Sequence, residues 1–399
     1  MIPVYFSKPS VLCAAGSSPD ELWNSVISGN QNGLKRVKAL NGKEFWAGRI
    51  DDNLLSEKSS SRYDMRIIRI EEKCLSGIED EIFRALEKYG PEKTGVCVGS
   101  CDNGTEFSVA GHRKFFADGK FDSTYSLEIQ GADYVATFIS EKYGIKGPSL
   151  TFSTACSSSA GAIIKAAELI QSGICDAVIC GGVDIASDTV LMGFDALEAV
   201  SSEKTNPFSA NRHGITLGEA AAFFVLSREN IWDEEKPVKL SGYGESADAY
   251  HMTSPDPSGN GAFAAINKSI SLDQLKQEKI DYINLHGTGT KYNDSMEAKA
   301  IDRIFGKTKV PCSTTKTLTG HTLGAAGALE AAVCWLTLTK NKGNSNPSYP
   351  VQIWDGVQDP AMPPLNITGK NFTKSGEIHN CLSNSFAFGG ANSCLILSL

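Results

Sequence analysis

Residues 149–170 read SLTFSTACSSSAGAIIKAAELI and join a predicted strand to a predicted helix. The run at 149–155 is apolar without alternation, which is typical of a strand covered on both faces. Small residues after Cys156 lead into a helical pattern at 158–173. Cys156 should therefore lie near a helix N-terminus, where aligned peptide dipoles favour negative charge and lower the pKa of a thiol. This position favours a nucleophile over the inert filler that most buried free cysteines provide.

Similar apolar runs and helical patterns alternate along the rest of the chain. Runs of the strand type lie at 95–100, 177–186, 220–227, 282–287 and 393–399. Further helical patterns lie at 68–90 and 132–144. Alternation of this kind predicts the α/β class with a covered, largely parallel sheet.

The strand-to-helix segment has a weak echo later in the chain. Residues 153–170 and 319–336 (TGHTLGAAGALEAAVCWL) both pass from a polar turn of small residues into a helix. Residues 178–187 and 382–397 both place two glycines after an apolar run. Chance similarity of small-residue turns and a duplicated two-half architecture, with a seam near 227–239, both stay open.

Length and charge limit the class of protein. The chain has 399 residues, with 38 Lys and Arg against 46 Asp and Glu, so its formal net charge is −8. This length fits two or three domains, or one large two-lobed unit. The acidic balance disfavours nucleic acid as a partner, because counterion-release binding needs clustered Lys and Arg.

Cysteine usage and the first residues indicate a compartment. The chain has 11 cysteines at irregular spacing, which favours reduced thiols in a cytosol over a disulfide framework. The start, MIPVYFSKPSVLCAAGSS, carries no charged leader, and no apolar run reaches the roughly 18 residues of a spanning helix. We expect a cytoplasmic protein with no membrane span.

A thiol nucleophile needs partners that hold or move charge. Two of the 6 histidines lie in glycine-rich turns: His286 follows the apolar run YINL, and His321 lies in KTLTGHTLGAAG before a helical pattern. These positions favour a catalytic pair over two structural histidines. Neither histidine has a zinc spacing to a nearby cysteine, so we expect no metal site.

Two further segments are candidates for the site, each with a plainer alternative. Lys316 is either a solvated lysine or, in an apolar turn, one that needs a carboxylate from Glu297 or Asp294. Phe388 precedes Gly389-Gly390 in NSFAFGGAN. A tight turn of this kind presents backbone N–H groups as an oxyanion hole, or simply ends a strand.

Seven segments in order resemble the β-ketoacyl-[acyl carrier protein] synthases, the elongating ketosynthases of types I and II. The resemblance covers nearly the whole chain, and its segments are GIKGPSLTFSTACSSS (144–159), GFDALEAVS (193–201), NPFSANRHGITLGEAAAFFVLS (206–227), DAYHMTSPDPSG (248–259), HGTGTKYND (286–294), KTLTGHTLGAAG (316–327) and NSFAFGGAN (384–392).

The resemblance implies a fold and an assembly. The fold is the thiolase fold, in which two pseudo-duplicated α/β halves pack in five layers, α-β-α-β-α. We expect the N-terminal half, with the nucleophile, over 1–235 and the C-terminal half, with the histidine pair, over 236–399. The family implies a homodimer with an interface close to both active sites, and a heterodimer with a related subunit stays open.

The resemblance also implies roles for the candidate residues. Cys156 accepts the acyl group, and His286 and His321 drive decarboxylation. Lys316 and Glu297 form a supporting ion pair. Phe388 is a gate beside the acyl pocket and, with Cys156, supplies backbone N–H groups to the thioester oxyanion. Positions that line the pantetheine channel are Thr253, Thr288 and Thr290.

The implied reaction is a decarboxylative Claisen condensation. An acyl group moves from a carrier thioester to Cys156, which needs a thiolate and an oxyanion hole. Decarboxylation of malonyl carrier then creates a carbanion that attacks the acyl carbonyl and extends the chain by two carbons. This chemistry serves fatty-acid or polyketide-type biosynthesis and needs no cofactor beyond the phosphopantetheine arm of the acyl carrier protein.

An acidic carrier needs a local basic patch, whatever the net charge of its partner. Arg66 and Arg69 are three residues apart on one predicted helix face, in a region that the family uses for this contact. Weaker candidates, with a solvated surface as the alternative, are Arg113, Lys114 and Lys204.

Two departures from the family bear on the substrate and on a local ion pair. Elongating synthases place small or apolar residues near the end of the acyl pocket, where this chain has Cys101, Asp102 and Asn103. An unpaired polar group is costly beside an alkyl tail, so we expect a shorter, polar, unsaturated or aryl primer. The segment RHG (212–214) replaces the usual R-D-G, which puts a local ion pair in doubt.

Two other functions remain as alternatives. A non-catalytic or chain-length-determining subunit of a heterodimeric ketosynthase would have no need for Cys156 together with His286 and His321. A degradative thiolase or starter-type condensing enzyme would use a Cys-His-Cys or Cys-His-Asn set, which the GHTLGAAG segment disfavours.

Overall fold

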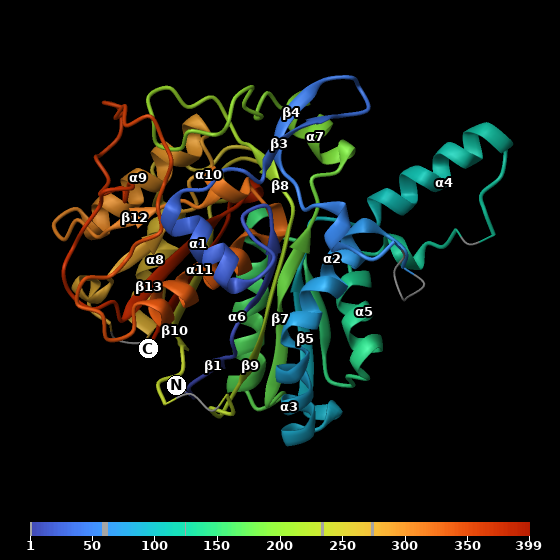
Figure 1. Cartoon of the computed structure of the whole chain (residues 1–399), viewed down its shortest axis with the longest axis horizontal. Helices are drawn as coiled ribbons and strands as arrows, with labels where there is room; N and C mark the ends of the chain where they lie inside the picture. The colour runs from blue at the N-terminus through green and yellow to red at the C-terminus, as the bar shows by residue number, and fades with distance from the viewer. Residues whose placement is uncertain (1, 58–62, 124, 233–234, 273–274) are drawn as a thin grey trace.

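Two sets of strands with the same internal order form the centre of the protein (Figure 1). The computed structural model describes residues 2–57, 63–123, 125–232, 235–272 and 275–399. The N-terminal set runs in the order β6 (Ser149–Phe152), β5 (Thr94–Gly99), β7 (Ala177–Asp184), β9 (Ala220–Ser227) and β2 (Ser10–Cys13). The C-terminal set runs in the order β12 (Cys312–Ser313), β11 (Tyr282–Asn284), β13 (Asn380–Phe386), β14 (Ala391–Ser398) and β10 (Lys239–Ala247).

The pairing directions of the two sets are identical. In each set the first three strands are parallel and the last two pairings are antiparallel. The short strand β1 (Tyr5–Phe6) pairs with both β9 and β10 and so joins the sets into one sheet. The duplicated architecture is therefore confirmed, and the internal echo is not a chance similarity. The predicted boundary at 235/236 falls between β9 and β10, beside residues 233–234, which lie outside the described residues.

The expectation of a largely parallel sheet is wrong, because each set is mixed. Between β13 and β14 only the turn at η8 (Phe388–Gly390) intervenes. A connection this short makes a hairpin, since parallel strands need a crossover of a dozen or more residues.

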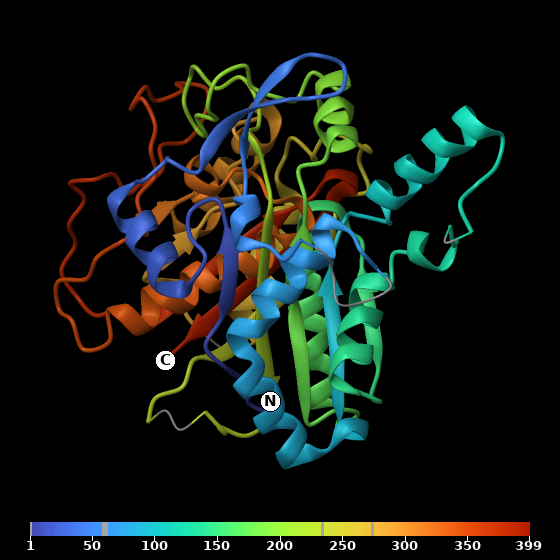
Figure 2. The same ribbon diagram turned by 45° about the vertical axis from the view of Figure 1, so that its right-hand side comes forward.

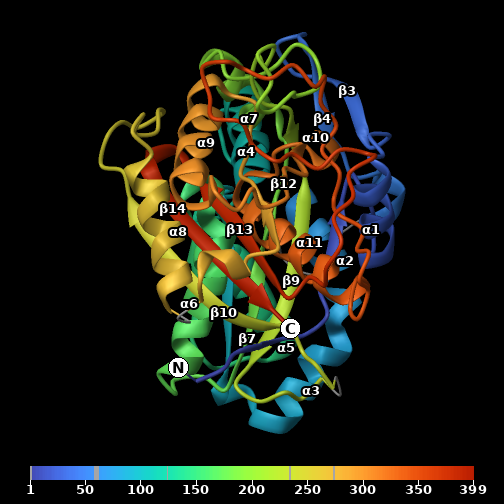
Figure 3. The ribbon, with the colours of Figure 1, turned by 90° about the vertical axis from the view of Figure 1, so that its left-hand side faces the viewer.

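Helices form three layers around these strands (Figures 1 and 3). The middle layer contains α6 (Ser158–Gln171) and α11 (Ala326–Lys340), which share one apolar core. Almost every residue of α11 is buried, as expected of a helix that is apolar all round. The outer layers are α2 (Arg66–Leu75), α3 (Glu79–Tyr89) and α5 (Tyr134–Tyr143) on the N-terminal set, and α8 (Asn260–Leu272) and α9 (Lys291–Phe305) on the C-terminal set. The five-layered thiolase fold is confirmed.

The predicted single helix at 68–90 is two helices. The 3-10 turn η2 (Ser76–Ile78) separates α2 from α3. A Cβ on Gly77 would lie 2.4 Å from Ser10 Oγ, so the chain passes close to β2 at this break.

An arm projects from the N-terminal half (Figure 2). Its helix α4 (Thr105–Asp118) buries no side chain, and Phe116 is 82% exposed. Stacked rings continue along the arm: Phe121 and Tyr125 have ring centroids 4.2 Å apart. The exposed rings of the arm and the outer edge of β6, which ends the sheet among the described strands, are surfaces of the kind that a partner covers.

Among the described helices, none is both long and apolar enough to cross a membrane.

Candidate active site

Cys156 lies in a tight turn between β6 and α6. The turn is the 3-10 segment η5 (Ala155–Ser157), in which Ala155 has a φ of 50°. Hydroxyl groups hold it: Ser158 Oγ accepts from Thr154 N at 2.9 Å and donates to the Ala155 carbonyl at 2.6 Å. The run of serines that follows the cysteine therefore fixes the backbone that presents the thiol, which is 5% exposed.

The Cys156 thiol is protonated in the free protein. Burial raises its pKa to about 11, although Lys316 and the backbone N–H of Phe388 lower it. Desolvation of the fully buried thiolate opposes the lowering of the pKa that is expected at a helix N-terminus. The thiol therefore needs a base within reach.

His321 lies within reach of the thiol. Its Nε2 lies 3.0 Å from Cys156 Sγ, and burial lowers the pKa of His321 well below its usual value, so the ring is neutral. Backbone hydrogen bonds to a loop of the N-terminal half hold the residue: His321 N donates to Thr216 O at 2.6 Å, and Gly218 N donates to His321 O at 2.9 Å.

His286 faces His321 across the site. It follows β11, and the two ring centroids are 5.4 Å apart with nearly perpendicular planes. Lys316 Nζ lies 3.4 Å from His286 Nδ1. Burial, followed by the positive charge of Lys316 and the proximity of His321, lowers the pKa of His286 well below its usual value. An ammonium group only donates, so Nδ1 is the acceptor and the proton of the neutral ring is on Nε2.

Cys156, His286 and His321 thus converge from three separate turns. One ligand atom from each lies within 4.8 Å of the others, a spacing that a metal ion could bridge. The ammonium of Lys316 beside His286 disfavours an added cation, because like charges repel strongly in a buried site.

Lys316 pairs with Glu330, so the predicted ion pair with Glu297 is wrong. Both side chains of the Lys316–Glu330 pair are nearly inaccessible, at 2% and 3% of their surface. Glu330 lies on α11, in the middle layer behind the short helix α10 (Lys316–Thr319). The only sequence signal was a lone carboxylate in the apolar pattern AGALEAAVCWL.

The carboxylates of α9 hold the histidine loop instead. Glu297 accepts from His286 N and Gly287 N, both at 2.8 Å, and from Asn384 Nδ2 at 3.0 Å. Asp294 accepts from the next two amides, Thr288 N and Gly289 N, both at 3.1 Å. Two carboxylates three residues apart on one helix face therefore bind four consecutive backbone amides. Neither carboxylate pairs with Lys316.

Phe388 lies at Cys156. Its backbone N–H lowers the pKa of the Cys156 thiol, and its ring centroid is 5.9 Å from that of Phe194 on α7 (Asp188–Ala196). Gly389 has a φ of 82°, a left-handed conformation that favours glycine and turns the chain back into β14. The turn thus presents an N–H group and an aromatic side chain at the thiol.

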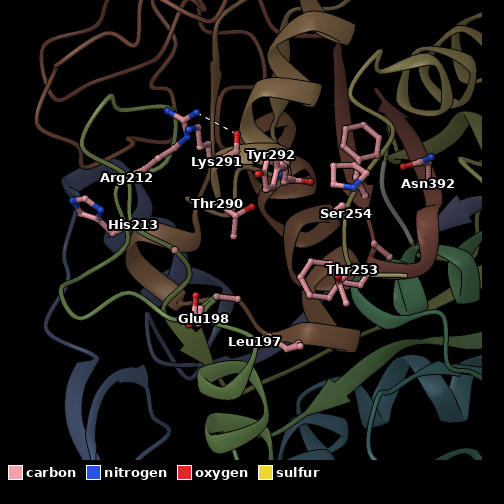
Figure 4. A pocket seen from close by; sticks show the side chains of 17 residues that line it. Leu197, Glu198, Arg212, His213, Thr253, Ser254, Thr290, Lys291, Tyr292 and Asn392 are labelled. Atoms are coloured by element: carbon pink, nitrogen blue, oxygen red, sulfur yellow. Dashed lines mark hydrogen bonds between the residues drawn. The ribbon is translucent and has the colours of Figure 1, made fainter. Parts of the chain in front are cut away.

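A cavity of about 340 Å³ adjoins Phe388 (Figure 4). It is lined by Thr253 and Thr290, and Thr288 Oγ1 lies 3.0 Å from Thr290 Oγ1. Figure 4 shows Arg212 and His213 on the side of the cavity opposite Thr253. His213 and Lys291 also line the cavity, which the sequence did not predict. The one signal was that His213 is the residue at which RHG departs from the usual R-D-G.

Arg212 keeps an ion pair despite that departure. Its guanidinium lies 2.6 Å from Asp359 and 3.8 Å from Asp294. It also donates to the Lys291 carbonyl at 3.2 Å and so holds the start of α9. Asp359 and Asp294, from two distant segments, thus supply the ion pair that the neighbouring His213 does not.

The predicted polar end of the acyl pocket is only partly polar. Asp102 accepts from Tyr134 Oη at 2.7 Å and from Gly104 N at 2.8 Å, and it is 6% exposed. Its carboxylate therefore holds the start of the arm and cannot be an unpaired group beside a substrate, contrary to the expectation. The neighbouring residues Cys101 and Asn103 are exposed.

Arg66 is held by acceptors of its own chain. Its guanidinium donates to both oxygens of the buried Glu219, to the exposed Asp52 and to the Ile50 carbonyl. Most of its donors are therefore committed within the chain, and its role in carrier docking stays a prediction.

The other predicted basic residues lie nearer the surface. Arg69 contacts Asp64 at 3.0 Å with 20% of its side chain exposed, and Lys114 pairs with Asp122. Lys204 lies 4.9 Å above the Trp46 ring, and Arg113 lines a separate surface hollow.

The repeated halves and the Cys-His-His centre define a condensing enzyme of the thiolase type. Residues 10–230 match the family described as "Beta-ketoacyl synthase, N-terminal domain", and residues 238–348 match "Beta-ketoacyl synthase, C-terminal domain". The chain belongs to the β-ketoacyl synthase family.

Relatives and solved structures agree with this assignment. The chain is 31% identical to 3-oxoacyl-[acyl-carrier-protein] synthase 2 of Coxiella burnetii, over 97% of this chain and 96% of the relative. It is 37% identical, with a TM-score of 0.90, to a chain of the Xenorhabdus doucetiae complex between ketosynthase ApeO and its chain length factor ApeC, covering 100% and 98% of the two chains. A β-ketoacyl synthase from Burkholderia phymatum is 26% identical with a TM-score of 0.85, covering 100% and 99%.

Proposed function

We propose that the protein is a 3-oxoacyl-[acyl carrier protein] synthase. It accepts an acyl group on Cys156 and condenses it with malonyl carrier, which adds two carbons and releases CO2. The observation that carries this proposal is the convergence of Cys156 Sγ, 3.0 Å from His321 Nε2, with His286 and a buried ammonium. The 3-oxoacyl synthases among its relatives support the same reaction.

The first half-reaction is acyl transfer. The neutral His321 takes the Cys156 proton, and the thiolate attacks the carrier thioester. Negative charge then develops on the carbonyl oxygen, where the backbone N–H groups of Cys156 and Phe388 stabilise it. The C–S bond to the carrier breaks, and the carrier thiol leaves with a proton.

The second half-reaction creates a carbanion and consumes it. His286 donates its Nε2 proton in a hydrogen bond to the malonyl thioester oxygen. His321 donates the second hydrogen bond in the tautomer that carries its proton on Nε2, an atom that is no longer needed as a base once Cys156 is acylated. Both rings are neutral because they are buried, so they stabilise the enolate without protonating it outright. The carbanion attacks the acyl carbonyl, the bond to Cys156 breaks, and the thiol takes up one proton.

The arm and the edge strand support a dimer. Phe116 on α4 and Leu150 on β6 are exposed at 82% and 37% in the single chain. A second copy or a related chain length factor would cover them, and the likeness to the ApeO–ApeC complex supports the second. A purely non-catalytic subunit is the weaker alternative, because it would need none of the three convergent side chains.

The primer and the compartment are part of the same proposal. Since Asp102 is paired, the polar character of the acyl pocket rests on Cys101 and Asn103, which still favours a polar, unsaturated or aryl primer over a long saturated one. All 11 cysteines are free thiols, which supports a reducing cytoplasm. The substrates arrive on a carrier's phosphopantetheine, and the cavity beside Thr253 and Thr290 fits that arm.

Intact-protein mass spectrometry tests the proposal. The protein is incubated with a panel of acyl carriers and then with malonyl carrier. We expect a single acyl adduct located on Cys156, followed by a 3-oxoacyl carrier two carbons longer. Absence of any adduct across short, aryl and long primers, with or without a chain length factor, would contradict the proposed activity.

A further inference from the structure

Asp184 is a buried carboxylate that the reaction above does not use. It is the last residue of β7 and is 1% exposed. Its Oδ2 atom accepts two backbone hydrogen bonds, from Cys101 N and from Gly324 N, both at 2.8 Å. Cys101 lies just after β5, and Gly324 lies three residues after His321. One oxygen atom therefore joins the acyl-pocket loop to the turn that carries His321.

The junction around this oxygen has no spare room. A Cβ added to Gly324 would lie 2.8 Å from both Asp184 Oδ2 and Cys101 N. A Cβ added to Gly182, on the same strand as Asp184, would lie 3.1 Å from Ala325 Cα. The histidine turn is thus pressed against β7, and Asp184 supplies its polar contact there.

The turn is also strained. Leu323 has a φ of 52°, a left-handed conformation that is unfavourable for a leucine. Strain of this kind persists only when the surrounding structure holds it. His321 is held on one side by Thr216 and Gly218, and Asp184 holds the other side through Gly324. Without Asp184 the turn is free to relax, which would move the imidazole.

A carboxylate is a costly choice for this position. Burial raises the pKa of Asp184 to about 7, and the N–H donors of Cys101 and Gly324 act in the opposite direction. An apolar residue would avoid this desolvation but would leave both amides without a partner.

We propose that Asp184 is a positioning residue that sets His321 against Cys156 and ties that placement to the acyl-pocket loop at Cys101. This inference rests on the proposed function, because it concerns the histidine that serves both half-reactions. Asp184 touches no reacting atom and acts through the His321 turn.

A double-mutant cycle with His321 tests this role. Asp184→Ala removes the acceptor, and Asp184→Asn keeps a carbonyl oxygen in its place. Glu71→Gln is the matched control, because Glu71 is another fully buried carboxyl of the N-terminal half and its oxygens have no partner among the described residues. The readouts are CO2 release from malonyl carrier at saturation, the melting temperature, and the pH profile of Cys156 alkylation by iodoacetamide, followed by peptide mapping.

We expect Asp184→Ala to lower kcat for decarboxylation on the order of 10²-fold, the effect of a displacement near 1 Å. In the His321→Ala background the same change should cause no further loss, because its effect passes through the missing ring. The alkylation profile of Asp184→Ala should match that of His321→Ala. Asp184→Asn and Glu71→Gln should stay within about threefold of the unmodified protein in every readout.

Three results would overturn the inference: wild-type decarboxylation in Asp184→Ala, an equal loss in the presence and absence of His321, or no rescue by Asp184→Asn. If Asp184→Ala does not fold, Gly324→Ala is measured instead, because its Cβ displaces the same turn. The loss of kcat that it causes should likewise be absent in the His321→Ala background. An unmodified protein that forms no acyl adduct would instead contradict the proposed function.

Discussion

Lys316 and Glu330 form an ion pair in which both side chains are almost fully buried, directly behind His286. Burial raises the pKa of Glu330 to about 7, although Lys316 lowers it. A pair of this kind contributes little net stability, but breaking it leaves an uncompensated charge in the interior. Its position gives it a chemical use, because the Lys316 ammonium fixes the tautomer of His286.

Removing one partner should therefore differ from removing both. We expect Glu330→Ala to lower the free energy of unfolding by about 3–5 kcal/mol, because Lys316 stays buried without a counter-ion. The double variant Lys316→Met with Glu330→Leu should recover most of that stability, yet decarboxylate slowly because His286 Nδ1 has lost its donor. Urea unfolding and CO2 release measure the two effects. Wild-type decarboxylation in the double variant would contradict the tautomer argument.

The two histidines should separate the half-reactions. His286 does not contact the thiol, so His286→Ala should form the acyl adduct at a rate within about threefold of the unmodified protein while decarboxylation falls at least ~10²-fold. His321 Nε2 contacts Cys156 Sγ, so His321→Ala should slow both steps. Timed mass spectrometry of the adduct and CO2 release give the two rates. Equal losses in the rates of adduct formation and decarboxylation in His286→Ala would refute this assignment of the two histidines.

Cys156→Ala should form no acyl adduct and should lose condensation by at least ~10⁴-fold, because no second nucleophile replaces the thiol. Cys175→Ala is the matched control, since its thiol is also free and buried but lies beyond the other end of α6. That control should keep its adduct. An adduct of normal yield in Cys156→Ala would disprove the nucleophile assignment.

Glu297 should make stability depend on pH. Burial raises its pKa to about 7 from a usual value of 4.5, so the folded protein binds this proton more tightly than the unfolded chain does. Its contribution is present at low pH and is lost as the pH rises towards 7. Relative to Glu297→Gln, the unmodified protein should lose about 2–3 kcal/mol of unfolding free energy between about pH 5 and pH 8. Urea titrations at both pH values check this, and an opposite slope would contradict it.

Arg66 and Arg69 should differ in what they affect. Arg66→Ala leaves Glu219 buried with one cation fewer and should destabilise the protein by about 3 kcal/mol. Arg69→Ala should change stability by less than about 1 kcal/mol, as expected of a partly exposed pair, and should raise the KM for the acyl carrier. Thermal melts and carrier titrations separate the two. A raised KM in Arg66→Ala at unchanged stability would support its docking role.

Local sequence patterns predicted much of the fold. Buried strands read as apolar runs, and the two Gly-rich turns that carry His286 and His321 were recognisable because small residues and turns are governed by short-range sterics. The mixed pairing of the sheet was missed, since strand direction depends on connections rather than on the strands. The predicted helix at 68–90 is too long, because no strong local signal marks the break at 76–78, where Gly77 lies close to Ser10, 67 positions away in sequence.

The sequence alone determined the α/β class and the three reactive side chains, because each of these depends on residues within a turn or two of one another. The two related halves were implied by the resemblance to the family and were established by the strand order of the structure. Tertiary structure decided which carboxylate neutralises Lys316, that Arg66 is committed to Glu219, and that Asp184 joins the Cys101 loop to the His321 turn. These contacts depend on which helix or strand end passes behind the site. Which element lies there is set by the packing of the two halves across a shared core. Because these charged groups are buried, each has few possible partners, and the packing selects among them.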